Sequence, residues 1–218
     1  MKVGTDAVLL GSWATIENCR KILDIGTGSG IIALMLAQRS NAAIDALDID
    51  KDACLQAQEN IKASPFHNPI QVIHSDLAAY VHNCTLRYDL IVSNPPYFIN
   101  SLKCPDRQRN TARHTDTLTL MNLLHDSGRL LSAGGKIALV LPYGQLEELQ
   151  FTAGENRLYI NRQTNVIPCT NGLPKRILIE LSHEKLDQVT PDILVIEESR
   201  HQYTEKYKAL TRDFYLKM

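Results

Sequence analysis

The sequence predicts a single α/β domain: a mostly parallel sheet of seven strands, with an antiparallel hairpin at its C-terminal end. Three observations support this. Short apolar runs alternate with helical stretches over the first two thirds of the chain, a glycine-rich turn joins the first run to a helix, and Asn171-Gly172 joins two later β-rich runs. This alternation is typical of βαβ units, whose parallel sheet is covered on both faces. With 218 residues and no internal repeat or linker, one domain is favoured.

The first part of the chain predicts five strands as short apolar runs at 21–24, 43–48, 70–74, 88–93 and 136–141. Apolar residues recurring every three or four positions predict helices at 31–39, 52–63 and 117–131. Asp116 is expected to cap the last of these helices. Gly134-Gly135 is expected to interrupt the chain before the fifth strand.

The two ends of the chain predict further elements. An amphipathic helix is expected to begin at Thr5 and Asp6, where Asp6 would serve as a cap, with its apolar face formed by Val8, Leu9, Ser12, Trp13 and Ile16. The β-rich runs at 157–167 and 175–181 are expected to form the antiparallel hairpin that closes the sheet. A helix from 204 to about 216 is expected to end the chain.

The composition argues against metal, redox and membrane functions. The five cysteines include no C-x-x-C pair and the seven histidines are scattered, so no metal site is expected. The longest apolar runs, such as 137–141, fall far short of the roughly 18 residues that span a bilayer. The N-terminus also lacks the pattern of a signal peptide. We therefore expect a cytoplasmic protein with no membrane contact.

The charge distribution leaves room for a local RNA site. A net charge of −1 argues against wrapping nucleic acid over the whole surface. Two segments are nevertheless locally basic, at 103–114 and 200–218. Such clusters are most often solvated surface, and the same holds for Lys175 and Arg176. The cluster at 103–114 comes shortly after the segment Asn94-Pro95-Pro96-Tyr97 in the sequence.

A glycine-rich loop at 26–30 follows the first strand and opens the first long helix. Glycines allow a tight turn and a close approach to a ligand, and a helix N-terminus favours a polar or anionic group. Gly28, Gly30 and Ala33 also satisfy a dinucleotide-binding pattern. However, Asp24 stands within the strand, where a carboxylate suits a cationic amino group better than a pyrophosphate. Asp48 ends the second strand, where it can accept hydrogen bonds from both hydroxyls of an adenosine ribose.

This pattern resembles the first motif of class I S-adenosylmethionine-dependent methyltransferases. The resemblance implies a Rossmann-like fold with S-adenosyl-L-methionine as the cofactor. It also implies that an acid after the third strand reaches the adenine amino group, although Asp76 could equally cap a short helix from Leu77. The candidate cofactor-binding residues are Thr5, Asp24, Gly26, Thr27, Gly28, Gly30, Asp48, Ile49, Ser75, Asp76 and Asn94.

The tetrad Asn94-Pro95-Pro96-Tyr97 follows the fourth strand and carries the candidate catalytic residues. Two prolines stiffen the backbone at the edge of the sheet where ligands bind in such folds. The Asn94 side-chain oxygen and the Pro95 carbonyl can each accept one N–H of an exocyclic amine, which directs the nitrogen lone pair at the methyl donor. Tyr97 offers a flat face on which a base can stack. The tetrad resembles that of methyltransferases acting on planar amide or amine nitrogens.

Three further segments resemble the bacterial tRNA(Val) (adenine(37)-N6)-methyltransferases. They are the N-terminal run at 1–11, Arg113-His114-Thr115-Asp116, and the C-terminal run at 203–216. The resemblance implies N6-methylation of the adenosine just 3′ of the anticodon of a valine tRNA, with Thr5 and Asp6 near the methionine end of the cofactor. A monomer is expected. Members generally carry a segment upstream of the position of Met1, next to the cofactor and substrate sites. The candidate substrate-binding residues are Phe98, Lys103, Arg107, Arg109, Arg113 and His114.

Other functions share some of these motifs. Glutamine N5-methyltransferases of release factors share the tetrad, but they carry a sizeable helical domain before the cofactor loop. Guanine N2-methyltransferases of ribosomal RNA commonly duplicate the domain and often have Phe at the position of Tyr97. A binding module without turnover is disfavoured by the intact Asp24, Asp48 and Asn94. A dehydrogenase is the least favoured, since nothing in the second half of the chain supplies a proton relay.

Overall fold

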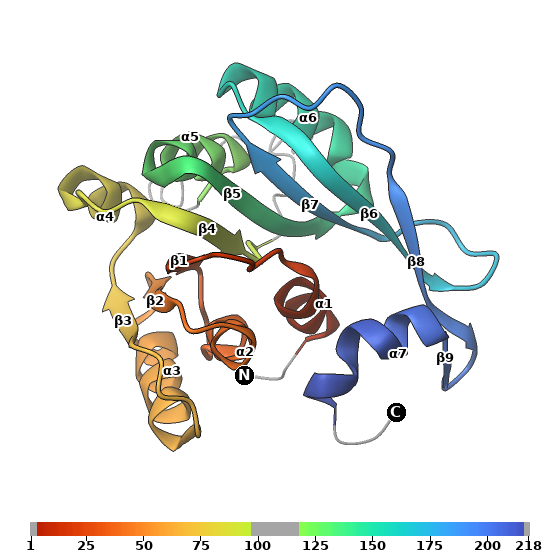
Figure 1. Ribbon diagram of the computed structural model, residues 1–218, viewed down its shortest axis with the longest axis horizontal. Coiled ribbons are helices and arrows are strands. Elements are labelled where there is room, and N and C mark those ends of the chain that lie inside the picture. The colour runs from red at the N-terminus through yellow and green to blue at the C-terminus, as the bar shows by residue number, and fades with distance from the viewer. Residues whose placement is uncertain (1–3, 97–117, 216–218) are drawn as a thin grey trace, which may run out of the picture.

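The structure is a computed structural model that describes residues 4–96 and 118–215. The described residues form one nine-stranded sheet in the order β3-β2-β1-β4-β5-β7-β6-β8-β9 (Figure 1). Its strands are β1 (Lys21–Ile25), β2 (Ala43–Asp48), β3 (Ile70–His74), β4 (Tyr88–Ser93), β5 (Leu131–Pro142), β6 (Tyr159–Cys169), β7 (Arg176–Ser182), β8 (Asp192–Ser199) and β9 (Gln202–Tyr203).

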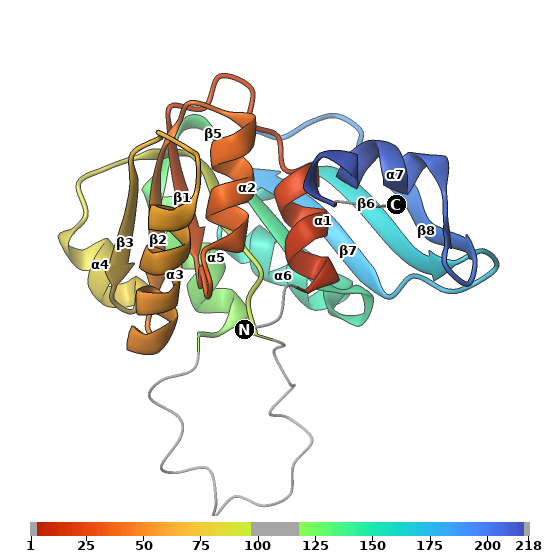
Figure 2. The same cartoon turned by 90° about the horizontal axis from the view of Figure 1, so that it is seen from below.

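Helices cover both faces of this sheet. They are α1 (Thr5–Trp13), α2 (Ile31–Arg39), α3 (Lys51–Ala63), α4 (Leu77–Asn83), α5 (Leu120–Leu130), α6 (Leu146–Glu155) and α7 (Glu205–Thr211). α4, α5 and α6 lie on one face, whereas α1, α2, α3 and α7 lie on the other (Figures 1 and 2). Alternate residues of the central strands therefore enter two separate apolar clusters, one under each helical layer. Within the described ranges no helix is long and apolar enough to cross a bilayer.

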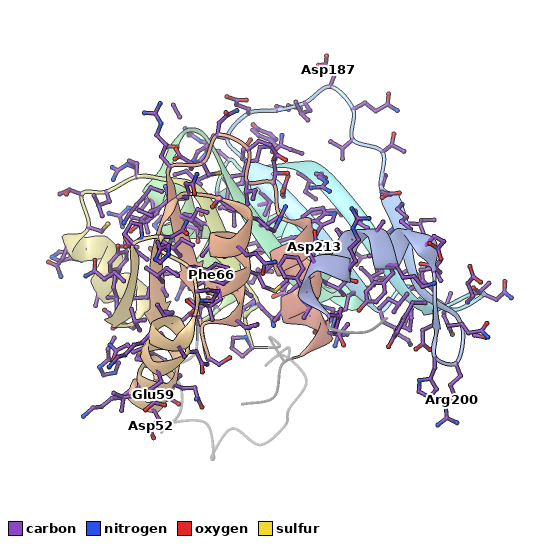
Figure 3. All side chains as sticks on the ribbon, turned by 60° about the horizontal axis from the view of Figure 1, so that its bottom comes forward. Asp52, Glu59, Phe66, Asp187, Arg200 and Asp213 are labelled. Carbon is purple, nitrogen blue, oxygen red and sulfur yellow. The ribbon has the colours of Figure 1, made fainter. Side chains whose placement is uncertain are left out.

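The strand directions bring many loops to one edge of the sheet. β1 to β5 run parallel, β7 runs antiparallel to β5, and β6 and β8 again run in the direction of β5. The carboxyl ends of all these strands except β7 therefore meet at the same edge. In Figure 3, Asp52 after β2 and Arg200 after β8 lie on one side of the molecule, and Asp187 after β7 lies on the opposite side.

The α/β fold expected from the sequence is confirmed, with differences in detail. β8 and β9 extend the sheet beyond the seven expected strands, because β8 pairs in parallel with β6. Gly134-Gly135 does not interrupt the chain before β5 but lies inside it, opposite a shift of register in β4. A Cβ on Gly135 would lie 2.7 Å from the Tyr88 carbonyl oxygen, so only glycine fits there. No sequence pattern predicted α6.

Expectations about three of the helices were wrong in detail. α1 is not amphipathic, because every residue from Ala7 to Trp13 is buried between the sheet, α2 and α7. Its N-cap is Gly4, so Asp6 is not the cap. α5 begins at Leu120 with Thr119 as the cap in place of Asp116, since the Thr119 side chain accepts the Asn122 backbone N–H. α7 ends at Thr211 and is followed by a 3₁₀ turn at Arg212–Phe214.

Candidate functional site

Four neighbouring strands end side by side at the edge that carries the glycine loop. In the sheet register, His74 of β3 lies opposite Asp48 of β2, and Ile25 of β1 lies opposite both Leu47 and Ser93. The residues that follow these ends are Ser75, Ile49, Gly26 and Asn94. The parallel order of β3-β2-β1-β4 thus brings together segments that are as far as about seventy residues apart in the sequence.

The loop at 26–30 depends on glycine at three positions. Gly26, Gly28 and Gly30 have φ values of 72°, 57° and 81°, a region that side chains rarely adopt. The Gly26 and Thr27 N–H groups both donate to the Leu47 carbonyl, which ties the loop to the end of β2. Gly30 is the N-cap of α2 and offers no capping side chain, so the start of α2 faces the loop with its backbone N–H groups.

Asp24 lies fully buried in β1, directly beneath this loop. One carboxylate oxygen, Oδ2, accepts the Thr27 hydroxyl at 2.7 Å, whereas Oδ1 is buried without a hydrogen-bond partner. Burial raises the pKa of Asp24 from 3.8 to about 7, although the hydrogen bond from the Thr27 hydroxyl and the nearby Ala33 backbone N–H oppose the increase. A buried oxygen with no partner is costly, and a cationic group placed beside it would remove that cost.

Asp48 organises the loop from the neighbouring strand. Its Oδ2 accepts the Gly28 N–H at 2.7 Å, and its Oδ1 accepts the Asp50 N–H at 2.9 Å. Each carboxylate oxygen has a further lone pair, so ribose hydroxyls can also donate to this half-exposed group. The next residue, Ile49, exposes 56% of its surface, which places an apolar side chain beside the acid.

Ser75 and Asp76 follow β3 at the same edge. The Ser75 N–H donates to the Asp48 carbonyl, and Asp76 Oδ1 accepts the Ala79 N–H as the N-cap of α4. The capping role that the sequence left open for Asp76 is therefore present. It leaves the other carboxylate oxygen of this exposed side chain available, so capping and adenine recognition are compatible.

Asn94-Pro95-Pro96 begins where β4 ends. Asn94 is half-buried, Pro95 is buried and Pro96 is exposed. Within 4–96 and 118–215 the Asn94 side chain makes no hydrogen bond, so its amide oxygen is available as an acceptor. Tyr97 and the six predicted substrate-binding residues, Phe98, Lys103, Arg107, Arg109, Arg113 and His114, lie outside the described residues.

Asp6 contacts the same edge of the sheet, at the start of β7, where Arg176 lies opposite Pro142 at the end of β5. Its Oδ2 accepts a hydrogen bond from Arg176 Nε at 2.9 Å, which joins α1 to the start of β7. Thr5 is exposed in the first turn of α1. The bond to Arg176 gives Asp6 a structural role that the sequence did not reveal, because the two residues are 170 positions apart.

Three basic residues of the C-terminal segment, Lys206, Lys208 and Arg212, are paired with acids. Lys206 contacts Asp192 at 2.6 Å, Lys208 contacts Glu205 at 2.8 Å, and Arg212 lies 3.8 Å from Asp213. Neighbouring acids therefore offset much of the positive charge that the sequence shows at 200–218. A phosphate-binding role for this segment gains no support from the structure.

Two contacts of the site were not predicted from the sequence: the bond between Thr27 and Asp24, and the link that Ser93 makes between two strands. Ser93 is 1% exposed, and its hydroxyl donates to the Ile25 carbonyl at 2.8 Å. No sequence signal identifies such a bond, since it depends on the register of β1 and β4.

Among the residues described, no group of three or more His, Cys, Asp or Glu side chains could hold a metal ion.

Comparison with known proteins agrees with this arrangement. Residues 3–148 match the family model described as the methyltransferase small domain. Relatives named tRNA1(Val) (adenine(37)-N6)-methyltransferase are 58% identical in Parabacteroides distasonis, 49% in Bacteroides fragilis and 44% in Trichodesmium erythraeum. Each of these alignments covers 100% of this chain and 92% of the relative.

Solved structures share the fold at low sequence identity. A predicted O-methyltransferase of Agrobacterium tumefaciens has a TM-score of 0.74 at 19% identity, covering 95% of this chain and 96% of that one. A putative methyltransferase, SMU.776, solved with SAH, has a TM-score of 0.62 at 13% identity, covering 82% of this chain and 50% of that one. These likenesses bear on the architecture alone.

Proposed function

The chain belongs to the family of the tRNA1(Val) (adenine(37)-N6)-methyltransferases, and on this premise we propose which reaction its site performs. The enzyme transfers a methyl group from S-adenosyl-L-methionine to the exocyclic N6 of adenosine 37, just 3′ of the anticodon, in a valine tRNA. The observation that carries the chemistry is the register of Ile25 against Ser93, which sets the glycine loop beside the Asn94-Pro95 corner.

The residues around the loop fit the cofactor. When bound, S-adenosylmethionine supplies a methyl group on a sulfonium, which is already activated for transfer to a nitrogen. Asp24 would face its ammonium group with the unpartnered Oδ1, and Asp48 would accept its ribose hydroxyls. Ile49 and Asp76 would contact the adenine from the ends of β2 and β3. The glycines allow the backbone to approach without steric conflict.

Asn94 and Pro95 prepare the attacking amine. An adenine amino group is a poor nucleophile, because its lone pair is delocalised into the ring. The Asn94 side-chain oxygen and the Pro95 carbonyl each accept one N–H, and together they favour the pyramidal nitrogen needed for attack. The two prolines hold these acceptors in place, so little reorganisation is required during the reaction. Tyr97 would stack on the base.

The RNA approaches from the same edge of the sheet. We propose that the basic residues Lys103, Arg107, Arg109 and Arg113 contact the phosphates of the anticodon loop. Such contacts would position the adenosine without reading the RNA sequence. We propose that the enzyme acts as a monomer. A tRNA substrate is consistent with action in the cytoplasm.

The test uses unmodified valine tRNA with tritiated S-adenosylmethionine, followed by digestion to nucleosides and mapping of the label. We expect N6-methyladenosine at position 37 only. A transcript with guanosine at that position is the matched control and should remain unlabelled. Label in the glutamine of a release factor, or in N2-methylguanosine of ribosomal RNA, would overturn the assigned substrate.

A further inference from the structure

Ser93 joins the two strands that carry the two halves of the site. It is the last residue of β4, it is 1% exposed, and its hydroxyl donates to the Ile25 carbonyl oxygen at 2.8 Å. Ile25 is the last residue of β1. Asn94 follows Ser93 directly, and Gly26 follows Ile25 directly, so the bond lies one peptide away from each half of the site.

Among the described residues, the backbone offers no further link between β1 and β4 beyond this point. Pro95 and Pro96 have no backbone N–H, so the ladder between β4 and β1 cannot continue through them. On the other side, Gly26 has a φ of 72°, and its N–H and that of Thr27 are directed to Leu47 of β2 rather than to β4. The loop is therefore secured to β2 by two backbone bonds, whereas the Ser93 hydroxyl secures the β1 end to β4.

We propose that Ser93 is a positioning residue for methyl transfer: its bond to Ile25 sets the place of Asn94 relative to the glycine loop. This inference rests on the function proposed above. Transfer requires the amine and the methyl group to be aligned, and a misplacement of about 1 Å can lower the rate about 100-fold. The hydroxyl itself is buried within the strand pair, so we assign it no direct contact with either substrate.

The test compares Ser93→Ala with Ser127→Ala as a matched control. Ser127 is also fully buried, but it lies in α5 and its hydroxyl has no hydrogen-bond partner. We expect Ser93→Ala to lower the single-turnover rate constant of tRNA methylation about 10- to 100-fold. Its dissociation constant for S-adenosylmethionine, measured by calorimetry, should stay within about twofold of the wild type. Ser127→Ala should change neither quantity by more than about twofold.

A second variant, Ser93→Cys, and the comparison of the methylation rate with the cofactor affinity distinguish a positioning role from a general loss of structure. Ser93→Cys retains a weaker donor of similar size and should give a rate between those of Ser93→Ala and the wild type. A rate for Ser93→Ala within twofold of the wild type would overturn the proposal, as would equal losses of rate and cofactor affinity, or equal effects of the two alanine variants. A wild-type enzyme that methylates no tRNA would instead refute the proposed function.

Discussion

Replacing Asp24 with Asn should stabilise the protein while weakening cofactor binding. Burial raises the pKa of Asp24 from 3.8 to about 7, so between these pH values the folded protein keeps a proton that the unfolded chain has lost. The free energy of unfolding therefore decreases as pH rises from about 4 to 7. One pKa unit corresponds to about 1.4 kcal/mol, so ionised Asp24 destabilises the folded state by up to about 4 kcal/mol above pH 7. Asp24→Asn removes this effect.

The assay is denaturant unfolding of wild type and variant between pH 5 and pH 8, without cofactor. Groups with lowered pKa values, such as Asp89 and Asp192, titrate in both proteins and cancel in the difference. We expect the variant to gain stability relative to the wild type as pH rises. Its affinity for S-adenosylmethionine at pH 7.5, measured by calorimetry, should fall about 10- to 100-fold, as expected when a charge-assisted hydrogen bond of about 1.5–3 kcal/mol is lost.

Asp45→Asn is the matched control, because Asp45 is a second buried carboxylate of the same sheet. Its Oδ1 accepts Lys21 Nζ at 2.7 Å and its Oδ2 accepts the Tyr88 hydroxyl at 2.6 Å, so this charge is satisfied. We expect Asp45→Asn to destabilise the protein by about 1–3 kcal/mol. An Asp24→Asn variant that is less stable than the wild type at pH 8, or a stability difference that does not change with pH, would refute this account of Asp24.

Three other predictions separate binding, turnover and packing. Asn94→Ala should lower turnover about 100-fold or more while leaving cofactor affinity nearly unchanged, and parallel losses would contradict its role. Asp48→Ala should raise the cofactor dissociation constant about 10- to 100-fold in calorimetry with little effect on turnover at saturation, because the variant would lose the proposed contacts to the ribose and the observed bond to Gly28. In thermal unfolding, Gly135→Ala should destabilise the protein by about 1–3 kcal/mol, whereas Gly154→Ala, where a Cβ meets nothing within 4 Å, should be neutral or stabilise α6 by up to about 1 kcal/mol. Equal effects of these two substitutions would refute the steric account of Gly135.

The sequence identified most of the elements that position the site. The bounds of β2, β3 and β4 were predicted to the residue, because apolar runs bounded by turn residues depend on local geometry. The glycine loop could also be predicted from the sequence, because its glycine spacing and its place between a strand and a helix are enough to identify it. The expected burial of α1 on one face was wrong, because its burial on all sides depends on the later packing of α2 and α7.

Some features of the candidate site could likewise be predicted from the sequence, whereas others depend on the tertiary structure. Asp24, Asp48 and Asn94 could be singled out from the chain, because residue type, spacing and the end of a strand are properties of the sequence itself. The raised pKa of Asp24, the bond from Ser93 to Ile25 and the pairing of the basic tail with acids were decided by the tertiary structure. Desolvation and cross-strand hydrogen bonds arise only when distant segments pack together, and the sequence pattern of a single segment carries no record of its neighbours.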